Sequence, residues 1–504
     1  MTHPVDDTAA GVTLTVDQLI AMNDADEILF TDAGDGRRYA NLYAEHVRYV
    51  IETDSWLVWN GNCWEPDTGG LKVLGLAAGV TRQLREQATD ESGEEPEGGG
   101  LSPRERMLRH AFGTESLDAR KRMVKTASLQ PVVQVLEEQL DSDKNTLVAT
   151  GCTIDLLTGE CRKTKAADLN TRIVTVKYDP DATSPLLMQY LETFIPEKED
   201  QDVVFAVLGN ALRGGNVGRL LPMLIGATTS GKSQLVEAIE KLLGRYSCSI
   251  GSSVFRGNLD DKPRPDLVKA MYTRVAIAVE ASKVWELHAD QIKRLTGGDR
   301  IPYRQLYQGV AEAVPRFTPV IVSNDMPRIK GADAALKRRI IVMRFDHTVP
   351  VGQEDTRIKE RFVNDERTLQ AILARLVRGA RSEMVRDGLR WDLIPQKFAV
   401  ATVDAIGEMS HIDEWLQWMR EEGHLQDDRS DIAVSAMAKA SDLHKHYSAW
   451  VKAHGDKADK QEELSLKDLN IALRERGWES KPSAGVRWVG KFLPSSTVMW
   501  NMGL

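Results

Sequence analysis

The sequence predicts an α/β fold in which a parallel central sheet carries a phosphate-binding loop, with a further domain on each side. Three observations lead to this expectation. A short apolar run at residues 220–225 leads into the pattern GxxxxGK[ST] at residues 226–233, and an amphipathic helical pattern follows. Further apolar runs at residues 275–279, 320–322 and 340–345 alternate with helical segments. Such alternation is typical of parallel sheets that carry helices on their faces.

Length and composition bound the class of protein. At roughly 100–200 residues per domain, 504 residues suggest about three domains. The 42% hydrophobic and 28% charged side chains are typical of a globular protein and disfavour a disordered or fibrous one. No apolar run approaches the roughly 18–20 residues that span a bilayer, and no secretory signal is evident, so we expect a cytoplasmic protein without a membrane partner. Four cysteines without CxxC spacing argue against a disulfide framework and a structural zinc site.

Residues 1–185 are predicted to form a mixed α+β domain that precedes the central sheet. Alternating residues around an Asn-Gly turn at 51–64 predict an antiparallel hairpin, and a second glycine turn lies within 151–161. Residues 172–178 alternate as a strand would. An acidic, glycine-rich stretch near residues 89–104 is expected to be a flexible insertion.

Three further segments complete the predicted organisation. Residues 186–350 begin with two helical patterns and continue as the ATPase domain with the parallel sheet. Residues 351–400 form a helical extension. Residues 401–504 contain three helical patterns followed by a β-like tail, which fits a winged-helix module.

The GxxxxGK[ST] segment predicts a nucleotide-binding site. Backbone N–H groups and the following helix N-terminus present positive partial charge to phosphates. Lys232 is expected to reach the β and γ phosphates and Ser233 to ligate Mg²⁺. The residues expected to bind nucleotide are Gly226, Ala227, Thr228, Thr229, Ser230, Gly231, Lys232 and Ser233. A chance glycine-rich turn is the alternative, and the strand and helix on either side disfavour it.

Polar residues follow two of the later strands, where ligands of open α/β sheets bind. Glu280 ends the apolar run at 275–279 and is a candidate for holding the metal or activating water. Strand-end carboxylates are common, so the phosphate-binding loop upstream is what favours this role. Asn324 ends the next apolar run and could orient the attacking water, although an Asn-Asp pair before Pro327 is also typical of a turn.

Basic residues concentrate between Ile292 and Ile341. This segment has ten basic and four acidic side chains, a net charge of +6, which leaves −15 for the rest of a chain whose total is −9. The total charge disfavours a nucleic-acid partner, whereas the local charge could pair with phosphates. Tyr303 or Tyr307 could stack a base, or could be a core residue. Arg338 and Arg339 could stabilise charge on a transferring phosphoryl group, or could form a solvated basic turn.

The segment Leu295 to Tyr307 reads LTGGDRIPYRQLY. In the order phosphate-binding loop, Glu-ended strand, LTGGDxIxxRxLY, Asn-ended strand and arginine pair, the chain resembles superfamily 3 helicases, and most of all those of satellite-phage and plasmid primase–helicase proteins. Those are AAA+ ATPases, typically hexameric, that translocate on single-stranded DNA. The region before the motor is similar to the poxvirus-type N-terminal region, and the C-terminal region to a winged helix.

The resemblance implies a role for individual residues. Lys232, Glu280 and Asn324 would act in catalysis, with Glu280 as the Walker B acid and Asn324 as the sensor. Arg338 or Arg339 would be the arginine finger that reaches the neighbouring subunit's ATP. Contacts to DNA would come from Lys293, Arg294, Arg300 and Arg304. Val279 stands where many Walker B sites carry a second acid, which leaves the second Mg²⁺ contact open.

The resemblance therefore implies an ATP-dependent DNA helicase of phage or mobile-element replication, working as a hexameric ring with ATP and Mg²⁺ in the host cytoplasm. Its partners would be single-stranded and forked DNA and a separate primase or replisome protein. Because the chain begins about thirty residues before the resemblance starts, primase activity is not expected. The alternative is an ATP-switched replication initiator with little unwinding activity. A packaging or partner-remodelling ATPase would leave the Leu295–Tyr307 motif unexplained.

Overall fold

The computed structural model forms two compact units. The first consists of residues 1–142 and 164–172, and the second of residues 143–163 and 173–504, so the chain passes between them three times. The residues that the structure describes are 30–91, 100–256, 264–280, 286–304, 310–330, 334–349, 356–407, 412, 415–416, 418–419, 437–454, 464–475, 478–483 and 485–489. Residues 92–99, half of the predicted flexible insertion at 89–104, lie outside them.

The first unit combines helices with a four-stranded sheet. Its helices are α2 (Asp32–Tyr43), α3 (Leu71–Asp90), α4 (Pro103–Gly113) and α5 (Leu117–Ala127). The sheet has the order β3 (Trp64–Pro66), β2 (Ser55–Trp59), β1 (Val47–Val50) and β4 (Gln134–Val135). The hairpin predicted around the Asn-Gly turn is confirmed, because β2 and β3 pair antiparallel with Trp59 opposite Trp64. Tyr39, Trp56 and Leu84 pack in the core of this unit.

The second unit contains the predicted parallel sheet, so the expected α/β fold class is confirmed. Its order is β16 (Ile340–Arg344), β8 (Leu221–Ile225), β14 (Thr318–Ser323), β10 (Val275–Glu280) and β9 (Ser247–Ser249). All four pairings are parallel. The three later apolar runs of the sequence are thus β10, β14 and β16. Because β14 lies between β8 and β10, the carboxyl ends of these three strands meet at one edge of the sheet.

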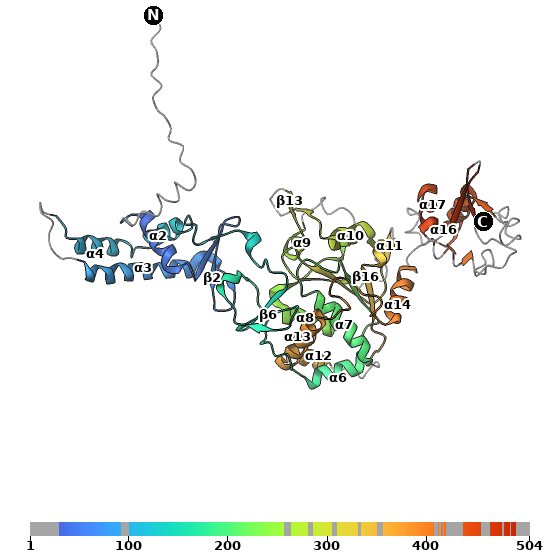
Figure 1. The fold of residues 1–504 in the computed structure, drawn as a ribbon, viewed down its shortest axis with the longest axis horizontal. Helices are drawn as coiled ribbons and strands as arrows, with labels where there is room; N and C mark the ends of the chain where they lie inside the picture. The colour runs from blue at the N-terminus through green and yellow to red at the C-terminus, as the bar shows by residue number, and fades with distance from the viewer. Residues whose placement is uncertain are drawn as a thin grey trace, which may run out of the picture. The chain divides into compact units, whose positions relative to one another are not determined.

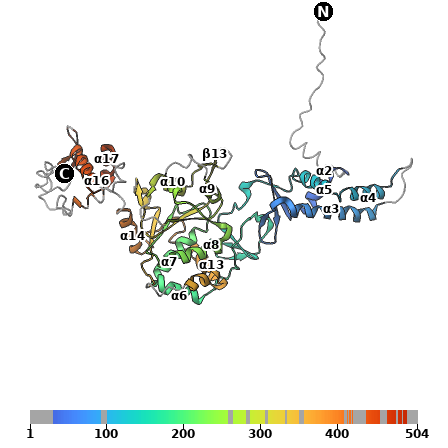
Figure 2. The same cartoon turned by 180° about the vertical axis from the view of Figure 1, so that it is seen from behind.

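Helices cover both faces of this sheet, and alternating strand residues separate two cores (Figures 1 and 2). On one face Val320 and Val322 pack with residues of α6 (Pro185–Phe194), α7 (Lys198–Asn210), α8 (Lys232–Leu243), α12 (Thr356–Asn364) and α13 (Glu366–Ala380). On the other face Ile321 packs with residues of α9 (Pro265–Ala270), α10 (Ala289–Gly297) and α11 (Ala334–Lys337). This period-two alternation is what a sheet buried on both faces requires.

A small antiparallel sheet joins the core of the second unit before α6 begins. It has the order β5 (Thr146–Ala149), β6 (Cys152–Asp155) and β7 (Cys161–Arg162), and the glycine turn predicted within residues 151–161 lies in it, with Gly159 between β6 and β7. A single disulfide joins Cys152 and Cys161. The strand predicted at residues 172–178 is wrong. The Val174 N–H donates to Val148 O and the Thr175 N–H to Leu242 O, both at 2.9 Å. Adjacent N–H groups therefore pair with different elements, and no ladder forms.

Two short strand pairs lie beside the parallel sheet in the second unit. The strands β11 (Glu286–His288) and β15 (Arg328–Lys330) are parallel. The strands β12 (Ile301–Arg304) and β13 (Val310–Ala313) form an antiparallel hairpin directly after α10. The helix α14 (Gln396–Gly407) packs on the edge strand β16, where Thr402 Oγ1 accepts a hydrogen bond from the Val342 N–H at 3.0 Å.

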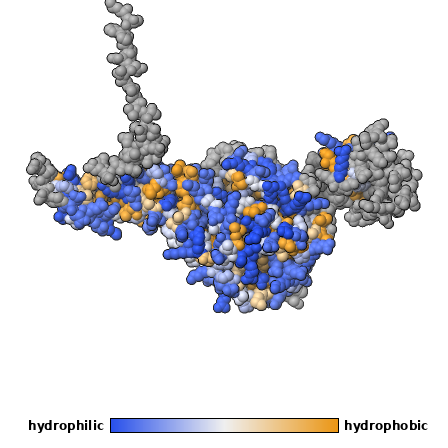
Figure 3. Space-filling view, in the orientation of Figure 1, coloured by the Kyte–Doolittle hydropathy of each residue, from blue (hydrophilic) through white to orange (hydrophobic). Residues whose placement is uncertain are grey.

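The described C-terminal part combines two helices with a small antiparallel sheet, and the winged-helix assignment stays a prediction. An antiparallel sheet of β17 (Met437–Lys439), β19 (Gly485–Val489) and β18 (Glu479–Ser483) accompanies α16 (Ala440–His454) and α17 (Leu466–Glu475). Trp415 is fully buried there among Leu443, Tyr447 and Leu469. Among the described residues, no helix has the length and apolar character needed to cross a bilayer. Hydrophilic residues cover most of the visible face around the parallel sheet, with small hydrophobic patches between them (Figure 3).

Candidate nucleotide-binding site

The loop between β8 and α8 depends on two glycines. A Cβ at Gly226 would lie 2.2 Å from the carbonyl oxygen of Phe345, which is closer than any side chain can approach. Gly231 caps α8 at its N-terminus with φ of +79°, and a Cβ there would lie 2.7 Å from the ring of Phe194. Only glycine adopts this backbone and this spacing without strain. The loop therefore leaves the N-terminal N–H groups of α8 free to face an anion.

Lys232 is the buried cation of this loop, with 5% of its surface exposed. Its Nζ donates to the carbonyl oxygens of Gly226 and Ala227, the latter at 2.8 Å, and to Ser230 Oγ at 3.1 Å. Burial lowers the pKa of Lys232, because the charged ammonium is removed from water. No carboxylate of the described residues forms an ion pair with it. A phosphate oxyanion would supply the missing negative charge, so this arrangement fits nucleotide phosphates.

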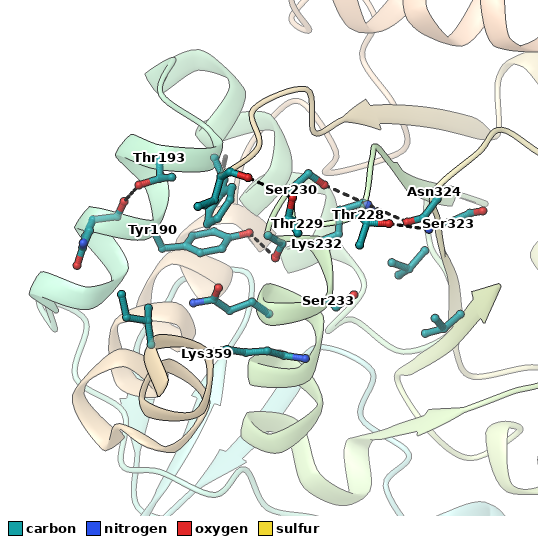
Figure 4. A pocket seen from close by; sticks show the side chains of 18 of the residues that line it. Tyr190, Thr193, Thr228, Thr229, Ser230, Lys232, Ser233, Ser323, Asn324 and Lys359 are labelled. Atoms are coloured by element: carbon teal, nitrogen blue, oxygen red, sulfur yellow. Dashed lines mark hydrogen bonds between the residues drawn. The ribbon is translucent and has the colours of Figure 1, made fainter. Parts of the chain in front are cut away.

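The loop lines a cavity of about 610 Å³, which lies within the range of small-molecule sites. Tyr190 and Lys359 lie on one side of the loop, and Ser323 and Asn324 lie on the other (Figure 4). The Tyr190 hydroxyl donates to the carbonyl oxygen of Gly231 at 3.0 Å and so ties α6 to the loop. The side near α6 and α12 is lined by the apolar side chains of Leu186, Phe194, Val349 and Ile358. A polar end and an apolar end are what a phosphate group and a base require.

Asn324 lies beside the loop because β14 is the neighbour of β8. Its Oδ1 accepts a hydrogen bond from Lys232 Nζ at 3.5 Å, and its Nδ2 donates to Thr228 Oγ1 at 3.4 Å. Ser323 lies one residue earlier and also lines the cavity. Its Oγ is buried and has no hydrogen-bond partner among the described residues. A polar atom in this position is available to a ligand or to a bound water.

Glu280 lies at the same sheet edge, opposite Ser323 in the parallel register, and lines the same cavity. Ser252 Oγ donates a hydrogen bond to its Oε2, and Arg256 Nη2 lies 3.8 Å from that oxygen. The preceding residue, Val279, is 61% exposed and also lines the cavity, so it supplies a methyl surface where a second acid could have stood.

The oxygen donors at this edge fit a magnesium ion that is held mainly by phosphates and water. Ser233 is exposed to the cavity at the start of α8, and the side chain of Glu280 is 16% exposed. Mg²⁺ prefers oxygen ligands and usually retains several waters, with only one or two protein ligands. Among the described residues, no group of three or more His, Cys, Asp or Glu side chains could hold a metal ion alone.

Arg338 and Arg339 lie at the amino ends of the sheet strands, whereas this cavity lies at their carboxyl ends. They precede β16, which runs parallel to β8, whereas the loop follows the carboxyl end of β8. Arg338 is exposed. Arg339 is half-buried, and its Nη1 donates to Thr296 Oγ1 at 2.8 Å and to the carbonyl oxygen of Lys293 at 3.1 Å. The structure therefore gives the two arginines different surroundings, with Arg339 bound to the last turn of α10.

The predicted DNA-contacting residues surround α10 and the hairpin that follows it. Lys293 and Arg294 are half-buried on α10, and Arg300 is exposed in the turn before β12. Arg304 belongs to β12, but its side chain lies outside the described part of the chain. Tyr303 is 4% exposed and packs in a core cluster, so it is a core residue and cannot stack a base. Tyr307 lies outside the described residues.

Several residues that line the cavity or contact Glu280 were not predicted from the sequence. Tyr190 and Phe194 are four residues apart on α6 and therefore lie on one helix face, which is the only local signal that they carry. Ser252 and Arg256 come from the segment after β9, and Ser323 is a polar residue at the end of a buried strand. Nothing in the local sequence of these three residues connects them with Glu280 or with the loop.

Comparison with known proteins gives similarities over both units. Residues 36–196 match the family described as "D5 N terminal like". The chain is 28% identical over 240 residues to "Putative helicase 184R" of Invertebrate iridescent virus 6, which covers 45% of this chain and 24% of that protein. It is 22% identical over 419 residues to "Putative helicase 121R" of Invertebrate iridescent virus 3, covering 73% and 43%. The chain thus spans less than half the length of these relatives.

Among solved structures, the apo form of the NrS-1 C-terminal region aligns with 90% of this chain and 98% of its own, at 11% identity and a TM-score of 0.45. The resemblance to helicases that the sequence predicts is confirmed by the match of the N-terminal region and by the viral relatives.

Proposed function

We propose that this chain, with its D5-type N-terminal region and its likeness to viral helicases, is an ATP-dependent DNA helicase of phage or mobile-element replication. One observation carries the proposal. Lys232 at the start of α8, Glu280 at the end of β10 and Asn324 directly after β14 line a single cavity that suits a nucleotide. An ATPase needs a phosphate-binding cation, an acid and a polar group that orients water, and these residue types meet there.

The roles of the residues follow from their positions. ATP, bound with Mg²⁺, supplies the phosphoanhydride bond whose hydrolysis releases free energy. Lys232 binds the phosphate oxygens, and the backbone of residues 226–231 surrounds them. Ser233 provides the hydroxyl ligand of the metal. Asn324 holds the attacking water. The Glu280 carboxylate accepts a proton from this water once Ser252 and Arg256 no longer contact the carboxylate.

The position of the arginine pair favours a ring of subunits. The strand β16 has five residues, about 16 Å at the usual rise per residue, and it separates Arg338 from the cavity of its own subunit. A neighbouring subunit related by rotation could bring its exposed Arg338 to this cavity, as a heterologous ring interface would. We therefore propose a hexameric ring in the host cytoplasm that acts on single-stranded and forked DNA with a separate primase or replisome protein.

Contacts to the DNA strand are proposed for Lys293, Arg294, Arg300 and Arg304, which follow one another along α10 and into the β12–β13 hairpin. Cations neutralise backbone phosphates and release counterions, so affinity for single-stranded DNA falls with salt. Replacing Lys293 and Arg304 together by alanine should reduce the slope of log K against log salt by about 1.4, because each contact contributes about 0.7. An unchanged slope would show that these two residues do not contact phosphates.

The central experiment compares Lys232→Ala with Lys241→Ala. Lys241 lies on the same helix, and its Nζ donates to Asn364 Oδ1 outside the cavity. We expect Lys232→Ala to abolish DNA-stimulated ATP hydrolysis and unwinding of a forked substrate while the fold is retained, and Lys241→Ala to keep both activities. Normal unwinding by Lys232→Ala would refute the proposal. Specific duplex binding by the unmodified protein, with ATP binding but little unwinding, would favour the initiator.

A further inference from the structure

A second cavity, of about 570 Å³, lies in the second unit and shares no lining residue with the nucleotide cavity. It forms where the turn between β6 and β7 meets α7, α13 and the segment that follows α13. Four arginines line it, namely Arg375, Arg378, Arg381 and Arg386. Neither the predicted ATP site nor the predicted DNA contacts use these residues, so the cavity has no role in the function proposed above.

The charge of this cavity is not neutralised within the described residues. Asp202 and Glu383 are its acidic lining residues, which leaves an excess of two positive charges. Among the described residues, none of the four arginines has a carboxylate within ion-pair distance. Arg375 Nη1 donates to Gln201 Oε1 at 3.3 Å, and Arg378 Nη2 donates to the carbonyl oxygen of Pro180 at 3.4 Å. The hydrogen bonds of Arg375 and Arg378 thus go to neutral acceptors.

The scaffold of the cavity is rigid because α7 and α13 are in close contact. A Cβ at Gly379 would lie 1.9 Å from the carbonyl oxygen of Phe205, and one at Gly209 would lie 2.2 Å from that of Leu376. The two glycines therefore allow backbone-to-backbone packing of the helices. The Arg375 guanidinium stacks 5.4 Å from the centre of the Phe205 ring, which fixes its direction.

The turn between β6 and β7 places a third glycine, Gly159, next to Arg381. A Cβ at Gly159 would lie 2.8 Å from Arg381 Nη1, so a larger residue would displace this guanidinium. The carbonyl oxygen of Gly159 accepts a hydrogen bond from the Tyr178 hydroxyl at 3.3 Å, which holds the turn in place. Arg375 and Arg381, which both line the cavity, are thus each held by a contact with a separate element.

The electrostatics of the site agree with this geometry. Burial lowers the pKa of Arg375, and the charge of Arg378 lowers it further, while the negative charge of Asp202 offsets only part of this decrease. Because α13 ends at Ala380, its C-terminus attracts cations, but a helix end carries only about half a unit of negative charge. The helix end therefore cannot balance the excess of two charges, and an anionic ligand would.

We propose that this cavity binds phosphate groups, as a second anion site separate from the ATP site. Guanidinium groups form paired hydrogen bonds with phosphate oxygens and bind them more selectively than ammonium groups do. The volume accommodates a small phosphorylated molecule or a short stretch of the phosphodiester backbone of DNA. Both sources present the same chemistry to the four arginines, and the experiment separates them.

The test uses the full chain and the double variant Arg378→Ala/Arg381→Ala, since both side chains are exposed and their removal should preserve the fold. Arg367→Ala is the matched control, because Arg367 is exposed on the same helix outside the cavity. Calorimetry with inorganic tripolyphosphate is carried out in a Lys232→Ala background, which removes binding at the loop of residues 226–233. Arg386→Ala repeats the test without altering α13.

We expect the double variant to bind tripolyphosphate at least about tenfold more weakly, and Arg367→Ala to remain within about twofold of its parent. This result with unchanged DNA binding identifies a small phosphorylated ligand. If the ligand is DNA, the double variant with an intact Lys232 lowers the salt slope for single-stranded DNA by about 1.4. The proposal is overturned if neither the double variant nor Arg386→Ala changes either measurement, or if Arg367→Ala weakens binding equally. Loss of ATPase activity in Lys232→Ala bears on the proposed function alone.

Discussion

Arg338 and Arg339 are adjacent in the chain, yet their replacement should have opposite consequences. Arg339→Ala removes two hydrogen bonds from a half-buried guanidinium to the last turn of α10, at 2.8 and 3.1 Å. Charged hydrogen bonds contribute about 1.5–3 kcal/mol each, and partial exposure reduces this, so we expect a loss of about 1–3 kcal/mol in the free energy of unfolding. Arg338→Ala removes an exposed side chain and should cost less than about 0.5 kcal/mol.

The effects on ATP hydrolysis should be reversed. If Arg338 is the finger of the neighbouring subunit, Arg338→Ala should lower the rate of DNA-stimulated hydrolysis about 10³-fold or more. Arg339→Ala should retain measurable hydrolysis below its lowered melting temperature. Urea unfolding gives the stability of both variants, and a coupled phosphate-release assay gives their rates.

A mixing experiment then tests whether the arginine acts between subunits. Lys232→Ala and Arg338→Ala are each inactive as pure rings, but a mixed ring contains interfaces at which an intact Lys232 faces an intact Arg338. Random assembly of equal amounts makes about a quarter of the interfaces competent, so about a quarter of the unmodified rate should return. Full activity of Arg338→Ala alone, or no recovery in mixtures that do exchange subunits, would refute the assignment.

Three further predictions follow from contacts elsewhere. Gly231→Ala puts a side chain on a left-handed backbone and displaces the Phe194 ring. It should therefore weaken nucleotide binding at least about tenfold and lower the free energy of thermal unfolding by about 1–2 kcal/mol. Unchanged nucleotide affinity would contradict this. Ser252→Ala should alter kcat for ATP hydrolysis and leave KM nearly unchanged, because Ser252 contacts Glu280 but does not line the cavity. A change confined to KM would count against this role of Ser252. Trp415→Ala should destabilise the C-terminal module by about 3–5 kcal/mol, measured by unfolding followed by tryptophan fluorescence. Because Trp415 packs in a core of its own, basal ATPase activity should be retained, and its loss would contradict this prediction.

The central sheet was predictable because its signals are local. Apart from Val279 and Arg344 near the carboxyl ends, the apolar runs at residues 220–225, 275–279, 320–322 and 340–345 are buried on both faces, and a strand of that kind appears in the sequence as a nearly continuous hydrophobic run. Residues 172–178 show the limit of the same argument. Val174 and Val176 are buried in alternation, as in a strand, but their segment lies between two different elements.

The candidate site was predictable only where its motif is contiguous. The loop of residues 226–233 carries its own chemistry in sequence, whereas the order of the strands decides that Asn324 lies beside Lys232. Pairing of Ser252 with Glu280 depends on a packing of segments 28 residues apart, which periodicity does not show. The sequence likewise could not distinguish Arg338 from Arg339, because only the position of α10 gives one of them a partner.

The division of the chain into interleaved units limits how the protein can be taken apart. Residues 143–163 supply Leu147 and Ile154 to the core around α7, α8 and α13, and Val174 joins that core only after the chain has returned to the first unit for residues 164–172. A single cut between residues 143 and 173 therefore removes part of this core from the fragment that carries the parallel sheet. A motor fragment that starts at residue 186 would expose the surface that these side chains cover and should aggregate. Recombination that exchanges the motor between related genes would have to carry the region from residue 143 onward as one block.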